Sequence, residues 1–189
     1  MNFPSSINPC DLRRLNVNDC QRLLQRLGQC FYEVVPLSFR TYCSLTARVV
    51  QRVLSHYGLD ATLLLCQLWC IMPDGNYVVG FVEGVGEVHS KWNGHVVCVC
   101  GDSFIDAAVF QLKRDFSLAE PVPNVVVGKR FGISSHAISR VDLGEQAHLF
   151  WLAAPQGWAH TLPEDPAQMI ECFASNLIAH LESASDLMT

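Results

Sequence analysis

The sequence predicts one α+β domain over residues 1–189, with N-terminal helices packed on a central antiparallel sheet and a helix near the C-terminus. Two early segments carry apolar residues at the three- and four-residue spacing of a helix face. Apolar runs separated by turn residues fill the middle of the chain, and a further helical pattern follows Pro166. Because 50% of the 189 residues are hydrophobic and only 16% are charged, the chain can bury a substantial core.

The two N-terminal helices have recognisable ends. The first begins at Asn18 or Asp19, either of which can cap it, and ends near Val34, before Pro36. The second spans about 41–58 and ends at a glycine. The apolar stripes comprise Leu23, Leu27 and Phe31 in the first helix, and Leu45, Val49, Val50, Val53, Leu54 and Tyr57 in the second.

The middle of the chain is predicted to form the sheet. Residues 61–72 are almost entirely apolar, and a strong turn signal follows at 73–76. The segment 110–123 has no clear period and is predicted to be irregular. The remaining predicted elements are strands at 77–82, 124–131 and 147–153, and a helix from Pro166 to about Glu182.

A β-hairpin centred on Gly101-Asp102 is the element on which the functional interpretation depends. Gly followed by Asp is typical of a two-residue turn with positive φ, and apolar runs flank it on both sides. Such a turn places residue 97 opposite 106, so that His95 and Asp106 lie on one face as diagonal neighbours. Both faces are largely apolar, which predicts a hairpin in the middle of a sheet that is covered on both sides. A histidine beside a carboxylate supplies two members of an acyl-transfer triad.

Cys43 is the candidate nucleophile. It lies in the first turn of the second predicted helix, where free backbone N–H groups and the helix dipole favour a thiolate, the reactive form. A cysteine at such a position is usually only a small buried residue, so the assignment depends on the His95–Asp106 pair in the following strands. Asp102 is the competing carboxylate. It lies in the turn, about seven residues from His95, which is too far at about 3.3 Å per residue.

Four motifs follow one another along the chain: C-S-L-T-A-R-V-V from Cys43, G-L-D-A at 58–61, G-H-V-V-C-V-C around His95, and F-I-D-A-A around Asp106. This order resembles the transglutaminase-like branch of the papain-like cysteine peptidase superfamily, a group that includes arylamine N-acetyltransferases and lasso-peptide leader peptidases. The resemblance covers residues 40–108. It implies a papain-like, transglutaminase-like fold in which Cys43 is the nucleophile, His95 the general base and Asp106 the residue that orients His95.

The function expected from this triad is hydrolysis of an amide or peptide bond by a single cysteine-peptidase-like domain, through a covalent thioester on Cys43. The expected partner is a peptide or small amide substrate, and no cofactor is expected. Two alternatives remain open: acyl transfer by the same three residues, and a non-catalytic binding domain that retains the fold. Transfer from coenzyme A is disfavoured because its phosphates call for clustered cationic side chains. None of the basic pairs adjoins Cys43 in sequence; they are Arg13-Arg14, Lys113-Arg114 and Lys129-Arg130.

The oxyanion donors are less defined by the sequence. The backbone N–H of Cys43 is one candidate, whereas Gln51 lies too far along the helix and Tyr42 is expected to be a buried packing residue. Zinc binding is an alternative role for the strand thiols, but their C-x3-C and C-x-C spacings are not those of zinc knuckles or ribbons. No metal is therefore predicted at these thiols, which are Cys66, Cys70, Cys98 and Cys100.

Composition argues against several other classes of protein. The formal net charge is -5 and the Lys and Arg residues are scattered, which disfavours nucleic-acid binding. No apolar run approaches the roughly 20 residues of a membrane span, so no membrane partner is expected. Residues 1–8 lack the pattern of a signal peptide. A cytoplasmic protein with nine reduced cysteines is therefore expected.

Overall fold

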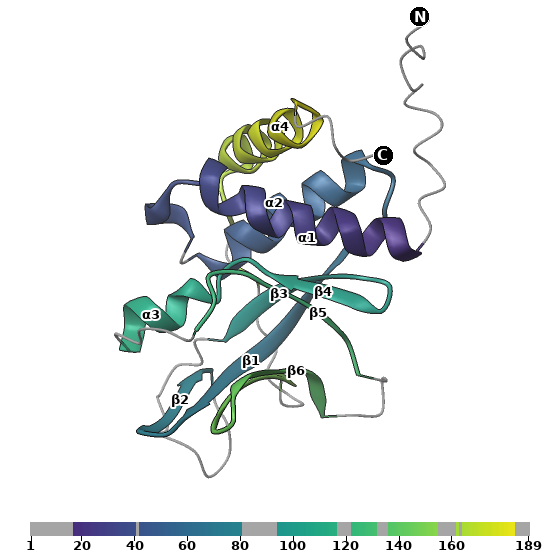
Figure 1. Ribbon diagram of the computed structural model, residues 1–189. Coiled ribbons are helices and arrows are strands. Elements are labelled where there is room, and N and C mark those ends of the chain that lie inside the picture. Colours follow the sequence, from purple (N-terminus) through teal and green to yellow (C-terminus); the bar gives the residue numbers. More distant parts are fainter. Residues whose placement is uncertain are drawn as a thin grey trace, which may run out of the picture.

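The computed structural model describes residues 17–40, 42–80, 94–116, 122–131, 136–154, 162 and 164–183. These residues form an α+β structure in which helices cover one face of a seven-stranded antiparallel sheet (Figure 1). The predicted arrangement of N-terminal helices, antiparallel sheet and C-terminal helix is confirmed.

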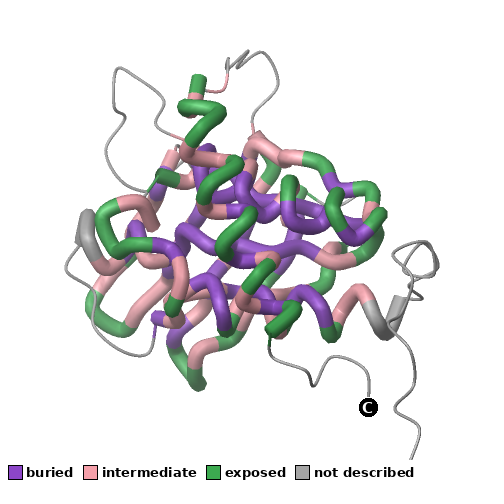
Figure 2. The backbone as a smooth tube through the Cα atoms, turned by 90° about the horizontal axis from the view of Figure 1, so that it is seen from above, coloured by how far each residue is buried: buried purple, intermediate pink, exposed green. Residues whose placement is uncertain are grey.

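Three helices cover the sheet: α1 (Val17–Val34), α2 (Cys43–His56) and α4 (Ala167–Ser183). The predicted apolar stripes of the first two helices face inward, and Phe31 and Leu54 are fully buried. Seen from above, the buried stretches of the chain gather in the centre of the molecule, with exposed stretches around them (Figure 2). The helices and the face of the sheet beneath them therefore share an apolar core.

The connection between α1 and α2 is fixed by Arg40. The chain leaves α1 at Pro36 and passes through a short 3-10 turn (Leu37–Phe39). The Arg40 side chain then turns back and donates hydrogen bonds to the carbonyl oxygens of Val35 and Tyr32. Its guanidinium lies 3.8 Å from the centroid of the Tyr32 ring. These contacts satisfy carbonyls that the end of a helix leaves free and direct the chain into α2.

The sheet is built around β1, which is flanked by β3 and β2 on one side and by β7 on the other. All strand pairs are antiparallel, and the strand order is β5-β4-β3-β1-β7-β6 with β2 also paired to β1. The strands are β1 (Thr62–Met72), β2 (Gly75–Val79), β3 (His95–Cys100), β4 (Ser103–Asp106), β5 (Val126–Lys129), β6 (Ala137–Gly144) and β7 (Ala147–Ala153).

The β3–β4 hairpin has the register that the sequence predicts. Cys98 pairs with Ile105 and Cys100 with Ser103, which leaves Gly101 and Asp102 as a two-residue turn. Gly101 has a φ of 56°, the left-handed conformation that such a turn requires. Every residue of β3 is buried, as expected for a strand inside a sheet that is covered on both faces.

The sheet curls so strongly that its two ends meet. The Phe131 backbone N–H, just after β5, donates to the Ile138 carbonyl of β6 at 2.7 Å. The Ser139 hydroxyl donates to the Lys129 carbonyl at the same distance. This nearly closed, barrel-like sheet has its own inner core, separate from the core beneath the helices. The inner core includes Val97, Val99, Phe104, Leu149 and Trp151.

Two elements differ from the sequence prediction. The prediction that 110–123 is irregular is wrong for its first part, because α3 (Phe110–Phe116) forms there. Leu112 of α3 is fully buried in the inner core, so tertiary packing stabilises a helix that local periodicity does not reveal. Strand β6 was not expected, because its polar, half-exposed residues lack an apolar run. Residues 81–82 of the strand predicted at 77–82 lie outside the described residues.

The close packing of β5 on β4 generates the first testable prediction. A Cβ added to Gly128 would lie 2.5 Å from the Phe104 ring, which is fully buried and packed against Trp151. Because this ring has no room to move, Gly128→Ala should lower the free energy of unfolding by about 1–3 kcal/mol. Chemical denaturation measures the change.

Gly75→Ala is the matched control. Gly75 also lies in a strand, but the nearest atom to an added Cβ is the Tyr77 hydroxyl oxygen at 3.8 Å, an ordinary contact. This variant should stay within about 0.5 kcal/mol of the wild type. Equal effects of the two substitutions would contradict the described packing of Gly128 on Phe104.

Candidate functional site

His95 and Asp106 form a buried hydrogen-bonded pair inside the curled sheet. His95 is the first residue of β3 and Asp106 the last residue of β4, so the hairpin brings them side by side. The His95 Nε2 atom lies 2.7 Å from the Asp106 Oδ2 atom, and neither side chain is exposed to solvent. The prediction that His95 and Asp106 lie side by side on one face is confirmed.

The Asp106 carboxylate has two further donors. The backbone N–H of Ala108 donates to Oδ1 at 2.9 Å, and the indole N–H of Trp151 donates to Oδ2 at 2.8 Å. An indole N–H and a backbone N–H can only donate, so both carboxylate oxygens act as acceptors. Nε2 of His95 must therefore carry the hydrogen in its bond to Oδ2, which leaves Nδ1 as the nitrogen available for other chemistry.

The pKa of His95 is raised by this arrangement. Burial acts to lower the pKa, but the charge and hydrogen bond of Asp106 outweigh it, and the nearby Cys43 acts in the same direction as Asp106. Together they raise the pKa of His95 to about 10. The Nδ1 atom of His95 is buried and has no hydrogen-bond partner among the described residues.

Cys43 is the first residue of α2 and lies at the start of β3. Its sulfur is half-buried and is 4.0 Å from the carbonyl oxygen of Gly94, the residue before His95. Tyr42 occupies the N-cap position in an extended conformation, and its side chain makes no capping hydrogen bond. The Tyr42 side chain is 56% exposed, so the expectation that it is a buried packing residue is wrong. The chain thus brings Cys43, His95 and Asp106 to one place.

The start of α2 is held by a carboxylate from a distant segment. Asp165, which precedes α4, accepts a hydrogen bond from the buried Ser44 hydroxyl at 3.2 Å. It also pairs with Arg48 at 3.1 Å, and its side chain is only 11% exposed. An acidic group at the N-terminus of a helix is favourable, and these two bonds fix the turn that carries Cys43.

Trp151 and Asp165 are the two residues of the site that sequence reasoning missed. Trp151 lies in a correctly predicted strand, but its contact with Asp106 depends on how far the sheet curls. Asp165 lies beside the Pro166 helix signal, more than 100 residues from its partners. No local pattern identifies either contact, because both are made between segments far apart in the chain.

The strand thiols are divided between the two cores. Cys66 and Cys70 point into the inner core, whereas Cys98 and Cys100 point toward the helices, so the four sulfurs do not converge on one metal. Burial raises the pKa of Cys98 to about 12 and that of Cys70 to about 11, which keeps these thiols protonated. The Cys100 and Cys20 sulfurs lie 3.6 Å apart as free thiols.

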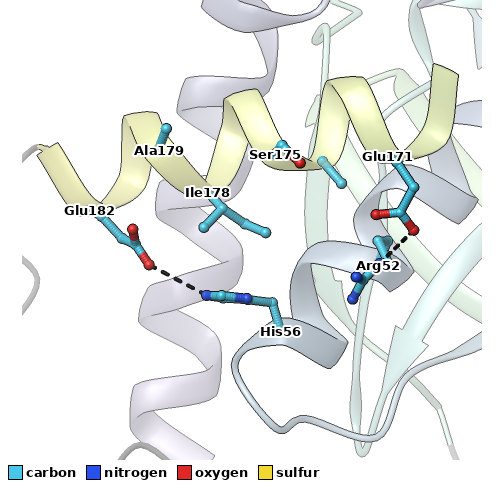
Figure 3. A pocket seen from close by; sticks show the side chains of 8 residues that line it. Arg52, His56, Glu171, Ser175, Ile178, Ala179 and Glu182 are labelled. Atoms are coloured by element: carbon cyan, nitrogen blue, oxygen red, sulfur yellow. Dashed lines mark hydrogen bonds and ion pairs between the residues drawn. The ribbon is translucent and has the colours of Figure 1, made fainter. Parts of the chain in front are cut away.

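A cavity of about 290 Å³ between α2 and α4 is a separate feature (Figure 3). Arg52 pairs with Glu171 at 2.8 Å and His56 with Glu182 at 3.4 Å across it. Its charged side chains are thus already paired with one another, and its lining contains no cysteine. The cavity therefore offers no alternative thiol to Cys43.

Comparison with known proteins identified no relative of this chain. The chain matches no family model, no curated protein and no solved structure. Among the described residues, no helix has the length and apolar character needed to cross a membrane. The geometry of the residues themselves is therefore the only basis on which we infer a function.

The raised pKa of His95 generates a prediction about stability and pH. Between about pH 6.5, the usual histidine value, and about pH 10, the folded protein holds a proton that the unfolded chain releases. The free energy of unfolding should therefore be highest below this window and fall as pH rises through it. His95→Gln should flatten the dependence between about pH 6.5 and 8.5.

Denaturant titrations at a series of pH values measure this effect. His56→Gln is the matched control, because His56 is exposed and its partner Glu182 is exposed as well. The control should keep the slope of the wild type. A wild-type slope that His95→Gln leaves unchanged would show that His95 is not protonated in the folded protein.

Proposed function

We propose that the protein is a cysteine hydrolase with a papain-like, transglutaminase-like fold that cleaves an amide bond in a peptide or small amide substrate. The observation that carries the proposal is the fully buried His95–Asp106 pair next to a half-buried cysteine at a helix start. A nucleophile, an imidazole and an orienting carboxylate in this relation constitute an acyl-transfer triad.

The proposed reaction begins with Cys43 as a thiolate and His95 as an imidazolium. The sulfur attacks the carbonyl carbon of the substrate, and the carbonyl π electrons move onto oxygen to give a tetrahedral intermediate. When the intermediate collapses, the C–N bond breaks and the Nδ1 proton of His95 passes to the leaving amine. The product of this half is a thioester on Cys43 with neutral His95.

Water completes the cycle. His95 removes a proton from water through Nδ1 as the oxygen attacks the thioester carbonyl. The C–S bond then breaks, the acid product leaves, and the thiolate–imidazolium pair is restored. Asp106 keeps its charge throughout and holds the ring in one orientation, which is the role of the carboxylate in such triads.

The start of α2 supplies the electrostatic support for this chemistry. The first N–H groups of a helix have no partner within the helix, and the Tyr42 side chain at the N-cap does not satisfy them. These dipoles favour negative charge on sulfur and on the carbonyl oxygen of the intermediate. The backbone N–H of Cys43 is the proposed oxyanion donor, and the exposed Tyr42 side chain forms part of the approach to the sulfur.

The Lys129-Arg130 pair lies at the hairpin turn, at the far end of β3 from His95. Lys129 pairs with Ser103 beside the hairpin turn, and the Arg130 backbone donates to Asp102 in that turn at 2.8 Å. His95 begins β3 at the other end of the strand, roughly 16 Å away at about 3.3 Å per residue. The pair therefore does not adjoin His95, and hydrolysis, which needs no phosphate-binding site, is the reaction that we propose.

Selective reactivity of Cys43 is the first test of the proposal. Iodoacetamide labelling at about pH 6, followed by peptide mapping, should modify Cys43 before the other thiols, because a thiolate paired with an imidazolium persists at this pH. Cys172 is the internal control, since it is exposed on α4. Faster labelling of Cys172 than of Cys43 would contradict the proposed nucleophile.

Turnover is tested with a mixed peptide library and mass spectrometry. Cys43→Ala should abolish cleavage, and Asp106→Asn should lower the rate by about 10²–10⁴-fold, the usual contribution of a positioned acid–base group. Cys172→Ala should cleave as the wild type does. Rapid Cys43-dependent transfer of acetyl from acetyl-coenzyme A, without peptide cleavage, would contradict the proposed hydrolysis and support acyl transfer as the reaction.

A further inference from the structure

The indole of Trp151 reaches Asp106 across most of the sheet. Trp151 lies on β7 and Asp106 on β4, and the strands β1 and β3 lie between them. In a flat sheet, three strand spacings of about 4.8 Å would separate the two strands by about 14 Å. The 2.8 Å bond from Nε1 to Oδ2 therefore exists only because the sheet curls and the two side chains meet inside it.

The indole N–H is directed at the oxygen that also binds His95. Oδ2 accepts from Trp151 Nε1 at 2.8 Å and from His95 Nε2 at 2.7 Å, while Oδ1 accepts from the Ala108 backbone. A carboxylate held at both oxygens cannot rotate about its terminal bond. The Trp151 ring is itself held, because it is fully buried and packs against Phe104 with a centroid separation of 4.8 Å.

We propose that Trp151 is a positioning residue for the triad: its indole N–H fixes the Asp106 carboxylate so that His95 presents Nδ1 to Cys43. This inference rests on the proposed function of the site. Trp151 acts through Asp106 and His95 and does not touch the substrate. An apolar ring of similar size would fill the same space, so the N–H, and not the volume, is the group to which the role is assigned.

The test compares Trp151→Phe with the wild type. Phenylalanine keeps an aromatic ring against Phe104 and removes the N–H donor. Trp69→Phe is the matched control, because its indole N–H also bonds to a side-chain oxygen, that of Asn76 at 3.1 Å, on an exposed part of the sheet. Circular dichroism and thermal unfolding establish that each variant is folded.

Two readouts are measured for each folded variant. The first is the rate of Cys43 alkylation by iodoacetamide from about pH 5 to pH 9. Trp151→Phe should lower the rate at about pH 6 by about 10–100-fold, the loss expected for one hydrogen bond to a buried charge. It should also replace the reactivity at acidic pH with the simple rise of an ordinary thiol.

The second readout is the ring ¹⁵N and Nε2–H signals of His95 by NMR, which report the tautomer and its bond to Asp106 whether or not the enzyme turns over. In the wild type the hydrogen should reside on Nε2 in a strongly downfield signal. In Trp151→Phe this signal should move upfield or broaden. Trp69→Phe should match the wild type in both readouts.

The outcomes separate this inference from the proposed function. Wild-type behaviour of folded Trp151→Phe in both readouts overturns the role of Trp151, even if Cys43 is catalytic. A second outcome is that the His95 signal changes in Trp151→Phe while Cys43 is unreactive even in the wild type. This outcome supports the positioning of His95 by Trp151 and overturns the proposed function. If Trp151→Phe does not fold, the benzothiophene isostere of tryptophan, which replaces N–H with sulfur at nearly the same shape, takes its place with the same expected results.

Discussion

The buried carboxylate of Asp106 is the constraint on which the site depends. An isolated charge in such a place costs far more free energy than a domain can supply, so its partners must be present in the folded state. They come from three parts of the sheet: His95 on β3, Trp151 on β7, and the backbone of Ala108 just after β4. The curl of the sheet is what allows all three to meet at one side chain. A flatter sheet would leave the carboxylate short of a donor.

The two hydrophobic cores pack on opposite faces of the sheet and have different roles. The helix-side core fastens α2 to the outer face of β3, while the inner core encloses the histidine and carboxylate on the opposite face. Cys43 and His95 are brought near each other because each is the first residue of its element. Asp165 strengthens this junction by tying the start of α2 to the segment before α4. The candidate site is therefore located where the two cores meet.

The parts of the site that local sequence chemistry controls could be predicted. Gly101-Asp102 sets the turn, the turn sets the register, and the alternation of side chains then brings His95 beside Asp106. The helix that begins at Cys43 and the last helix could be predicted from their apolar periodicity and from the residues that begin or end a helix. These inferences use interactions within about a dozen residues, for which pattern and geometry suffice.

The rest could not be predicted, because it depends on contacts between distant segments. Trp151 meets Asp106 only through the curvature of the whole sheet, and Asp165 meets Ser44 in the region where α4 packs on α2. Helix α3 is stabilised because Leu112 packs into the inner core, although the local sequence of the helix has no clear period. Tyr42 is exposed because the N-cap of α2 is at the surface, which apolar character alone does not reveal.

The central claim is that Cys43 and His95 share one proton-transfer site, and an NMR titration of the His95 ring tests it most directly. Cys43 contributes to the raised pKa of His95. Cys43→Ala should therefore lower the pKa of His95 from its wild-type value, while Cys172→Ala should leave it unchanged. A His95 titration that is identical in the wild type and in Cys43→Ala would show that the two residues do not interact, and would contradict the account.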